Sequence, residues 1–350
     1  MNKKVVVGMS GGVDSAVSAL LLKEQGYEII ALFMKNWEEK DGSGMCQSTQ
    51  DFEDVARVCG LLDIPYHTIN FVQEYWDSVF GNFLEELKCG YTPNPDILCN
   101  REIKFKHFFN KTLSLGADFL ATGHYAQING ARLLKGADPN KDQSYFIYTL
   151  KKEKLPKILF PIGGLKKSEV RAIARAHGLP VSDKRDSTGI CFIGKRDFKE
   201  FISHYIPFHK GIIEDVDGKV LGEHDGVAYY TLGQRKGLGI GGPGDAWFVT
   251  AKDPERNVIT LAQGDDHPSL YRQEIEATDL SWVGEPPSEL PYACRAKIRY
   301  RQADQPCFIT HIENDFLRVR FVTPQRAVTP RQSIVFYQGE ECLGGGLIKA

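Results

Sequence analysis

The chain has 350 residues, of which 42% are hydrophobic and 25% are charged, and its formal net charge is −2. The length exceeds what one hydrophobic core usually organises, so we expect two or three globular domains. No apolar run reaches the roughly 18 residues of a membrane-spanning helix, and the near-neutral charge excludes a general electrostatic attraction to nucleic acid.

Short apolar strands alternate with amphipathic helices from Lys3 to about Gly123, which predicts an α/β domain with a parallel sheet. We expect Gly26 and Gly60 to end the first two helices. Beyond Pro207 the apolar residues alternate, and turn dipeptides punctuate the chain, which predicts an all-β region. The expected strands cover 5–9, 28–34, 65–71 and 118–123, the expected helices include 75–88, 168–178 and 196–206, and the expected hairpin turns are 217–218, 253–254 and 314–315.

The first strand runs into Ser10-Gly11-Gly12 and then directly into a helix. Two glycines allow a tight turn whose N–H groups face an anion, and the helix N-terminus adds positive potential, so we predict a phosphate site. The Gly-Lys-Ser/Thr ending of a Walker loop is missing. Because the carboxylate of Asp14 would repel phosphates unless a divalent cation joined them, we expect ATP with Mg²⁺. The alternative is a glycine turn that caps a helix without binding a ligand.

Eight cysteines are present without a Cys-x-x-Cys pair, so we expect neither a structural zinc nor an iron–sulfur cluster. Cys99 precedes a helix expected to begin near Asn100, and Cys191 lies in a polar, glycine-bearing stretch. Basic neighbours surround both, which predicts exposed loop cysteines that act as nucleophile or sulfur carrier. An inert structural role is the alternative for each. Packing roles are expected for Cys59, Cys294, Cys307 and Cys342.

The segment SGGVDS resembles the loop of the pyrophosphate-loop ATPases, which split ATP between the α and β phosphates and transfer AMP to an oxygen. Together with FMKNW, NPDILCN, TGHYA and TGICFIG, it resembles the tRNA-specific 2-thiouridylase family over essentially the whole chain. The resemblance implies a Rossmann-like catalytic ATPase domain at 1–206, a small β-rich central domain at 207–270, and a tRNA-contacting C-terminal β-barrel at 271–350.

The implied reaction is adenylation of the wobble uridine O2 of tRNA, followed by sulfur transfer to give 2-thiouridine. Cys191 would carry a persulfide, Cys99 would act as the nucleophile, and a transient disulfide would join them. Asp96 is the candidate general acid or base, with a loop cap as the alternative. A persulfide donor protein, such as a cysteine desulfurase or a sulfur relay, and a reductant are the implied partners. We expect a cytoplasmic protein with no membrane partner, because the N-terminal stretch lacks the features of a secretory signal.

The family resemblance also assigns contact residues. ATP would be surrounded by Gly8, Met9, Ser10, Gly11, Gly12, Val13, Asp14, Ser15, Met34 and Gly123. The target base and the tRNA would contact Asn94, Pro95, Asp96, His124, Lys141, Asp142, Gln143, Arg299, Tyr300 and Gln332.

Arg295, Lys297, Arg299 and Arg301 recur at strand period, which would place four cations on one sheet face. This pattern of charge fits a face that contacts phosphates and equally fits a face that is only solvated. Two other functions also remain open: an ATP-dependent amidation with ammonia, which would leave both cysteines unused, and a non-catalytic ATP-responsive RNA-binding protein.

Overall fold

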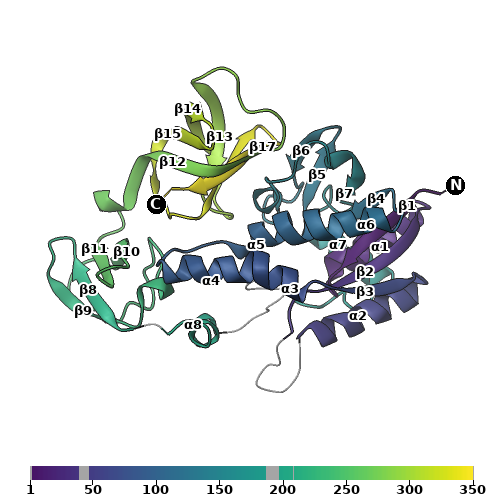
Figure 1. Ribbon diagram of the computed structural model, residues 1–350, viewed down its shortest axis with the longest axis horizontal. Helices are drawn as coiled ribbons and strands as arrows, with labels where there is room; N and C mark the ends of the chain where they lie inside the picture. Colours follow the sequence, from purple (N-terminus) through teal and green to yellow (C-terminus); the bar gives the residue numbers. More distant parts are fainter. Residues whose placement is uncertain (1, 39–46, 187–196, 208, 350) are drawn as a thin grey trace.

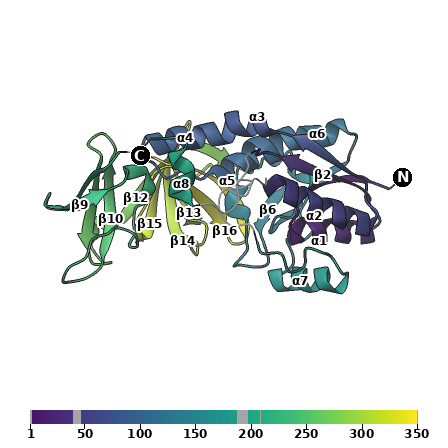
Figure 2. The same cartoon turned by 90° about the horizontal axis from the view of Figure 1, so that it is seen from below.

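The structure is a computed structural model that describes residues 2–38, 47–186, 197–207 and 209–349. A parallel-sheet domain with covering helices, a small antiparallel-rich sheet and a β-barrel follow one another along the chain (Figure 1). Figure 2 shows the three parts in a row, with the barrel in the centre. The predicted fold class is confirmed.

The first sheet has five parallel strands in the order β3-β2-β1-β4-β7. The central strand β1 is almost wholly buried, as expected where helices cover both faces of a parallel sheet. Four of the strands were predicted, and the fifth, only two residues long, was not. The strands are β1 (Lys4–Met9), β2 (Glu28–Lys35), β3 (Tyr66–Asn70), β4 (Phe119–Ala121) and β7 (Ile158–Leu159).

Alternate residues of β1 belong to two different apolar clusters, because successive side chains of a strand point to opposite faces. Val5 and Val7 pack with α1 (Val13–Glu24), α2 (Gln47–Leu62) and α7 (Lys167–Ala176). Val6 packs with the helices of the other face. These are α3 (Val72–Tyr75), the π-helical η1 (Trp76–Phe80), α4 (Gly81–Lys88), α5 (Pro95–Leu98), the π-helical η2 (Cys99–Phe108) and α6 (Phe109–Ser114).

The two predicted helix ends differ in outcome. Gly26 follows α1 with φ of +83°, the left-handed conformation that glycine adopts readily, so this prediction is confirmed. Gly60 lies inside α2, which continues to Leu62, and Asp63 takes the left-handed conformation instead with φ of +49°. The prediction for Gly60 was wrong because the apolar face of α2 continues through Leu62, whose burial favours another half turn of helix.

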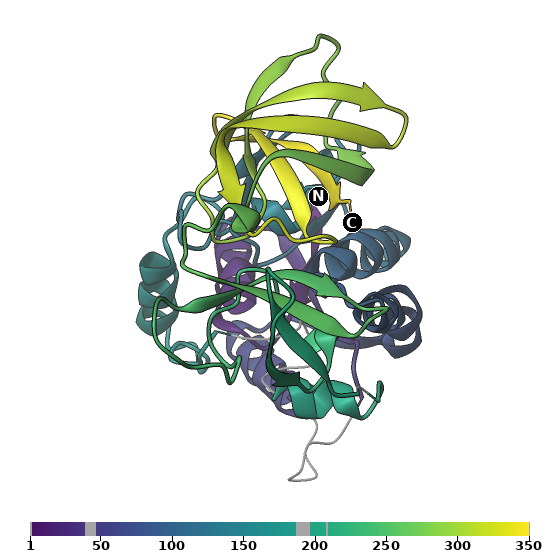
Figure 3. The same ribbon diagram turned by 90° about the vertical axis from the view of Figure 1, so that its left-hand side faces the viewer.

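Helix α8 (Phe198–Ser203) packs in the apolar cluster of the first domain, and the middle part that follows is a sheet of order β10-β11-β8-β9. The predicted turns at 217–218 and 253–254 join its two hairpins and are confirmed. Figure 3 shows this sheet in front of the parallel-sheet domain and below the barrel. Its strands are β8 (Gly211–Asp215), β9 (Val220–His224), β10 (Trp247–Asp253) and β11 (Val258–Gln263).

The last part is a closed six-stranded barrel of order β12-β15-β14-β13-β16-β17, in which β12 also pairs with β17. A hairpin of the parallel-sheet domain, β5 (Ala126–Asn129) and β6 (Arg132–Lys135), adds to β17 through β6 and was not predicted. The barrel strands are β12 (Tyr271–Trp282), β13 (Tyr292–Lys297), β14 (Gln305–Glu313), β15 (Phe316–Arg326), β16 (Ser333–Gln338) and β17 (Glu341–Ile348).

A shared core joins the barrel to the first domain. Tyr145 and Tyr148 are buried in the same apolar cluster as Tyr337 of the barrel. The hydroxyl of Tyr145 donates to the carbonyl of Ser333 at 2.8 Å, and the hydroxyls of Tyr148 and Ser333 lie 3.1 Å apart. Hydrogen-bonded buried polar groups specify one docking geometry, so the barrel is fixed on the first domain. Among the described residues, no helix combines the length and the apolar character that crossing a membrane requires.

Candidate nucleotide and thiol site

The glycine loop lies between the carboxyl end of β1 and the first turn of α1, where open α/β sheets bind their ligands. The hydroxyl of Ser15 accepts from the backbone N–H of Ser10 at 3.2 Å and donates to the carbonyl of Gly12 at 3.1 Å. The side chain of Ser15, in the first turn of α1, thus holds the glycine loop in a closed turn. The N-cap residue Gly12 makes no side-chain cap, which leaves the helix N-terminus open to an anion.

Two glycines allow close backbone approach at this loop. Gly11 has φ of +73°, and a Cβ there would lie 2.5 Å from the carbonyl oxygen of Asp51. A Cβ on Gly123, which follows β4, would lie 2.8 Å from the backbone nitrogen of Ser15. Any larger residue at either position would displace backbone. The loop is therefore enclosed by α2 on one side and by the end of β4 on the other.

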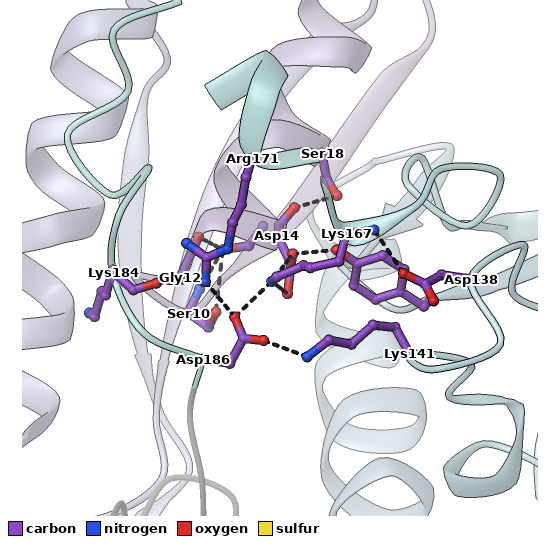
Figure 4. A network of polar contacts seen from close by, with 12 residues as sticks. Ser10, Gly12, Asp14, Ser18, Asp138, Lys141, Lys167, Arg171, Lys184 and Asp186 are labelled. Atoms are coloured by element: carbon purple, nitrogen blue, oxygen red, sulfur yellow. Dashed lines mark hydrogen bonds and ion pairs between the residues drawn. The ribbon is translucent and has the colours of Figure 1, made fainter. Parts of the chain in front are cut away.

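Asp14 is held by two side chains that lie far away in the sequence. Lys167, in the first turn of α7, places its Nζ 2.7 and 2.8 Å from the two carboxylate oxygens (Figure 4). The hydroxyl of Tyr125 donates to Oδ1 at 2.8 Å. Burial and the charge of Asp14 raise the pKa of Tyr125, so this phenol stays a hydrogen-bond donor. The structure thus places an ammonium group beside the carboxylate for which we expected a metal ion.

Lys167 also contacts Asp186, which forms ion pairs with three basic side chains (Figure 4). Arg171 Nη2 lies 3.0 Å and Lys167 Nζ 2.8 Å from its Oδ1, and Lys141 Nζ lies 2.5 Å from its Oδ2. Partial burial raises the pKa of this carboxyl, but the hydrogen bonds and charges of Lys141 and Lys167 outweigh it and lower the pKa to about 2. Asp186 is therefore a permanent anion that links α7 to the loop containing Lys141.

A second lysine closes the other side of the glycine loop. Lys184 Nζ donates to the carbonyl of Gly11 at 3.0 Å and to the carboxylates of Asp51 at 2.7 Å and Asp54 at 2.5 Å. Burial lowers the pKa of Lys184, but its bonds to Asp51 and Asp54 raise it further. The two lysines hold the loop against both α2 and α7.

Cys99 is fully buried and lies inside a helical stretch, which corrects the expectation of an exposed loop cysteine. The helix begins at Pro95, one turn earlier than predicted. Asn94 is its N-cap, because the side-chain oxygen accepts from the N–H of Asp96 at 3.1 Å, and proline suits the first helical position. The basic neighbour Arg101 pairs with Glu102 and with Asp279 of the barrel. The basic surroundings of Cys99 are therefore partly neutralised.

Cys191 lies outside the described residues, so its predicted role as persulfide carrier stays a prediction. Asp186, the hub of the ion-pair network, is the last described residue before that segment. Of the predicted packing cysteines, Cys59, Cys294, Cys307 and Cys342 are all buried, as expected.

The predicted ATP residues cluster at one edge of the parallel sheet. Gly8 and Met9 end β1, Met34 lies near the carboxyl end of β2, and Gly123 follows β4. A Cβ on Gly8 would lie 3.2 Å from the ring of Phe108, so helix η2 closely approaches the strand there. Contact of these residues with ATP stays a prediction.

The first group of predicted tRNA residues makes contacts within the protein. Lys141 pairs with Asp186, and Gln143 accepts from the backbone N–H of Tyr125 at 3.0 Å. Asp142 is buried and pairs with Lys297 at 3.1 Å. The buried ring of His124 lies 2.7 Å from the hydroxyl of Thr122, and burial lowers its pKa well below the usual value. His124 is therefore neutral in this structure, and the predicted tRNA contacts of these residues stay predictions.

The proposed row of four cations does not form, because β13 ends at Lys297. Arg299 donates to the carbonyls of Leu232 and Ala327, and Tyr300 packs on Phe146 with ring centroids 4.4 Å apart. Gln332 donates to the carbonyl of Thr92. Arg295 pairs with Asp304, so the charges of this segment point in several directions.

Sequence reasoning missed Lys167, Lys184, Asp186 and Tyr125. The segment Asp183-Lys184-Arg185-Asp186 has the dense mixed charge of an ion-pair cluster. This charge pattern is the feature of the sequence that could have indicated Lys184 and Asp186.

A parallel sheet with a glycine loop at the end of its first strand, followed by a small sheet and a closed barrel, defines a pyrophosphate-loop nucleotide-binding protein. Three family models match the chain: a "tRNA methyl transferase HUP domain" over residues 3–195, a "tRNA methyl transferase PRC-barrel domain" over 199–263, and an "Aminomethyltransferase beta-barrel domain" over 272–348.

The chain belongs to the tRNA-specific 2-thiouridylase family. It is 60% identical over 352 residues to "tRNA-specific 2-thiouridylase MnmA" of Protochlamydia amoebophila, with 99% of this chain and 93% of the relative covered. A relative from Geobacillus kaustophilus, "tRNA-specific 2-thiouridylase MnmA 2", is 55% identical, with 99% and 94% covered. The solved structure of U34-tRNA thiolase NcsA from Methanococcus maripaludis is a distant match, with 21% identity, coverage of 58% and 65%, and a TM-score of 0.37.

Proposed function

We propose that this chain is a tRNA-uridine 2-sulfurtransferase that consumes ATP and converts the wobble uridine of tRNA to 2-thiouridine. The observation that carries the proposal is the 60% identity, over nearly the whole of both chains, to a relative named for this activity. The glycine loop at the strand-to-helix turn and a cysteine at a helix within the same domain supply the two chemistries that the reaction needs.

In the first step, the uracil O2 attacks the α-phosphorus of ATP, and pyrophosphate leaves. The N-terminus of α1 and the loop N–H groups would hold the phosphates, and Lys167 would share its charge between them and Asp14. Each oxygen of a carboxylate can accept more than one contact, so partly exposed Asp14 also fits as one ligand of Mg²⁺, with phosphates as others. The metal ion would neutralise phosphate charge.

In the second step, the terminal sulfur of a Cys191 persulfide attacks C2 of the adenylated base, and AMP leaves with the O2 oxygen. The thiolate of Cys99 then attacks the Sγ of Cys191, which forms a Cys99–Cys191 disulfide and releases the sulfur on the base. Asp96 would move the protons. The disulfide holds two electrons fewer than the two thiols, so a dithiol reductant must reset the enzyme, and a protein persulfide donor must reload Cys191.

We further propose the domain division 1–206, 207–270 and 271–350, with tRNA bound against the first and last, and a cytoplasmic location in contact with the tRNA pool. The tRNA contacts proposed are Asn94, Pro95, Asp96, His124, Lys141, Asp142, Gln143, Arg299, Tyr300 and Gln332.

The test supplies ATP, unmodified tRNA, cysteine and a cysteine desulfurase, and measures pyrophosphate and thionucleoside. We expect Cys99→Ser and Cys191→Ser to form no thionucleoside. Cys89→Ser is the matched control, because Cys89 is an exposed thiol at the end of α4, and it should retain wild-type turnover.

Thionucleoside formation by both cysteine variants would refute the sulfur-transfer mechanism. Pyrophosphate release that depends on ammonia would indicate the amidation alternative instead. ATP binding without pyrophosphate release would indicate a non-catalytic RNA-binding protein.

A further inference from the structure

Thr92 lies two residues before the cap of the helix that contains Cys99, and both β domains contact it. Gln332 of the barrel donates its side-chain N–H to the carbonyl of Thr92. The Thr92 hydroxyl lies 3.5 Å from the hydroxyl of Thr231 and 3.4 Å from Nζ of Lys252, both in the middle part. The carbonyl oxygen of Thr92 therefore accepts from the barrel, and its hydroxyl oxygen contacts the middle part.

Lys252 is an unusual side chain for a domain junction. Its Nζ donates to the carbonyl of Tyr230 at 2.7 Å as well as to Thr92, and it has no carboxylate partner among the described residues. Burial alone lowers the pKa of this lysine to about 8. A partly buried ammonium without a carboxylate partner costs stability, and its two hydrogen bonds to oxygens of Tyr230 and Thr92 offset part of that cost.

Gln332 is equally well anchored on the barrel side. Its backbone carbonyl accepts from Ile348 of β17 at 2.8 Å. The preceding residue, Arg331, makes a two-pronged ion pair with Glu86 of α4. The barrel thus contacts the chain both before Thr92 and at Thr92 itself.

Further contacts fix the same segment at both ends. A Cβ on Gly90 would lie 2.5 Å from Cγ of Pro254 in the middle part, so the side chain of Pro254 packs directly against the backbone of Gly90. After Cys99, Arg101 donates to Asp279 of the barrel at 2.8 Å. Residues 90–101 are therefore clamped between the two β domains.

We propose that Gln332 and Lys252 are positioning residues for sulfur transfer, because they hold Thr92 and through it fix the placement of the helix containing Asp96 and Cys99. The inference rests on the proposed function. Only Pro93 separates Thr92 from the helix cap Asn94, and the chain is helical from Pro95 onward, so the position of Thr92 constrains where Asp96 and Cys99 lie. A misplacement of about 1 Å at reacting groups costs on the order of 100-fold in rate.

The kinetic constant that changes distinguishes the positioning role of Gln332 from its predicted tRNA contact. A residue that only binds tRNA contributes to KM for tRNA, whereas one that positions a reacting thiol contributes to kcat. Lys252 was not among the expected tRNA residues, so it supplies an independent second position.

The experiment compares Gln332→Ala and Lys252→Met with wild type in the desulfurase-coupled assay, and it measures kcat and KM for tRNA separately. We expect kcat to fall roughly 10- to 100-fold in both variants, with KM for tRNA within about threefold of wild type in Lys252→Met, because Lys252 is not a proposed tRNA contact. Lys252→Arg should recover most of the activity, because its guanidinium still donates to both acceptors. The matched controls, expected to be normal, are Gln338→Ala at the exposed end of β16 and Lys210→Met, whose exposed side chain pairs with Glu223.

Thr92→Val keeps the branched shape and removes the hydroxyl, so it tests the junction even if a charged-residue variant does not fold. Its kcat should fall, and its loss and that of Lys252→Met should be less than additive, because both changes remove the contact between the Thr92 hydroxyl and Lys252. Wild-type kcat in these variants, or a loss confined to KM, overturns the inference. If wild type itself forms no thionucleoside, the proposed function fails instead.

Discussion

At the residue scale, the central finding is that Asp14 is paired with a lysine from the other end of the domain. The two residues are 153 positions apart in sequence, so no local pattern connects them. The loop SGGVDS itself indicated a phosphate site, since two glycines before a helix N-terminus suffice for that prediction. We expected a cation beside Asp14, and among the described residues Lys167 places an ammonium group there.

Replacement of Lys167 by methionine should weaken ATP binding. The change leaves the carboxylates of Asp14 and Asp186 near the phosphates without the shared ammonium, and like charges repel at this distance. We expect the Kd for ATP to rise about tenfold or more, measured by calorimetry with a non-hydrolysable analogue. Lys166→Met is the control, because Lys166 is adjacent and exposed; equal affinities of the two variants would contradict the role.

The lowered pKa of Lys252, about 8, makes stability depend on pH. Between pH 8 and the ordinary lysine value of about 10.5 the unfolded chain binds this proton and the folded chain does not, so the cost of burying the charge disappears as pH rises. The free energy of unfolding of wild type relative to Lys252→Met should therefore increase by about 3 kcal/mol from pH 7 to 10.5. Urea titrations of both proteins at the two pH values test this, and a difference that does not change with pH would contradict it.

At the element scale, the helices and strands with strong periodicity were predictable, and the start of the cysteine helix was not. The stretch Asn94-Pro95-Asp96 contains both a cap and a favoured first residue, but the two prolines suggested a loop that extended to Cys99. The hairpin β5–β6 was missed because its strands have four residues each and gain their partner from β17, about 200 positions away. Pairing of that kind is a tertiary property that no local window contains.

The cap of this helix gives a prediction that does not depend on activity. Asn94→Ala removes the acceptor for the N–H of Asp96 and should cost about 1 kcal/mol in the free energy of unfolding. Asn94→Asp keeps an acceptor and should remain within a few tenths of wild type. Chemical denaturation of the three proteins measures both values. Equal destabilisation by the two substitutions would show that the amide nitrogen, and not the cap, holds the segment.

At the scale of the whole molecule, the middle part and the barrel both contact the domain that contains the candidate site. The change of texture after Pro207 predicted separate β domains, and the fold confirms their presence. What composition could not show is that Tyr145, Tyr148 and Tyr337 form one core across the boundary. Interfaces between domains of one chain are commonly more polar and mobile than this one. A fixed barrel is what allows Gln332 to hold a segment of the catalytic domain.

The buried pair Asp142–Lys297 tests how firmly the barrel is fixed. Both side chains are at least nine-tenths buried, and Oδ1 of Asp142 also accepts from the N–H groups of Gly136 and Ser144. Lys297→Met should cost about 3–5 kcal/mol, because it leaves a buried carboxylate without its counter-ion. The double variant with Asp142→Asn keeps the backbone hydrogen bonds without the charge, so it should be more stable than Lys297→Met alone.

The exposed pair Arg318–Glu276 of the same barrel is the matched control, and Arg318→Met should leave the free energy of unfolding almost unchanged because solvent screens this pair. Denaturant unfolding of wild type and these three variants provides the comparison. A loss for Lys297→Met as small as that of the control would mean that the interface tolerates an unpaired charge, and the barrel would then be free to move on the catalytic domain. In that case Gln332 could not act as a fixed support, so the outcome at this buried pair decides between a rigid clamp and a mobile tRNA-binding module.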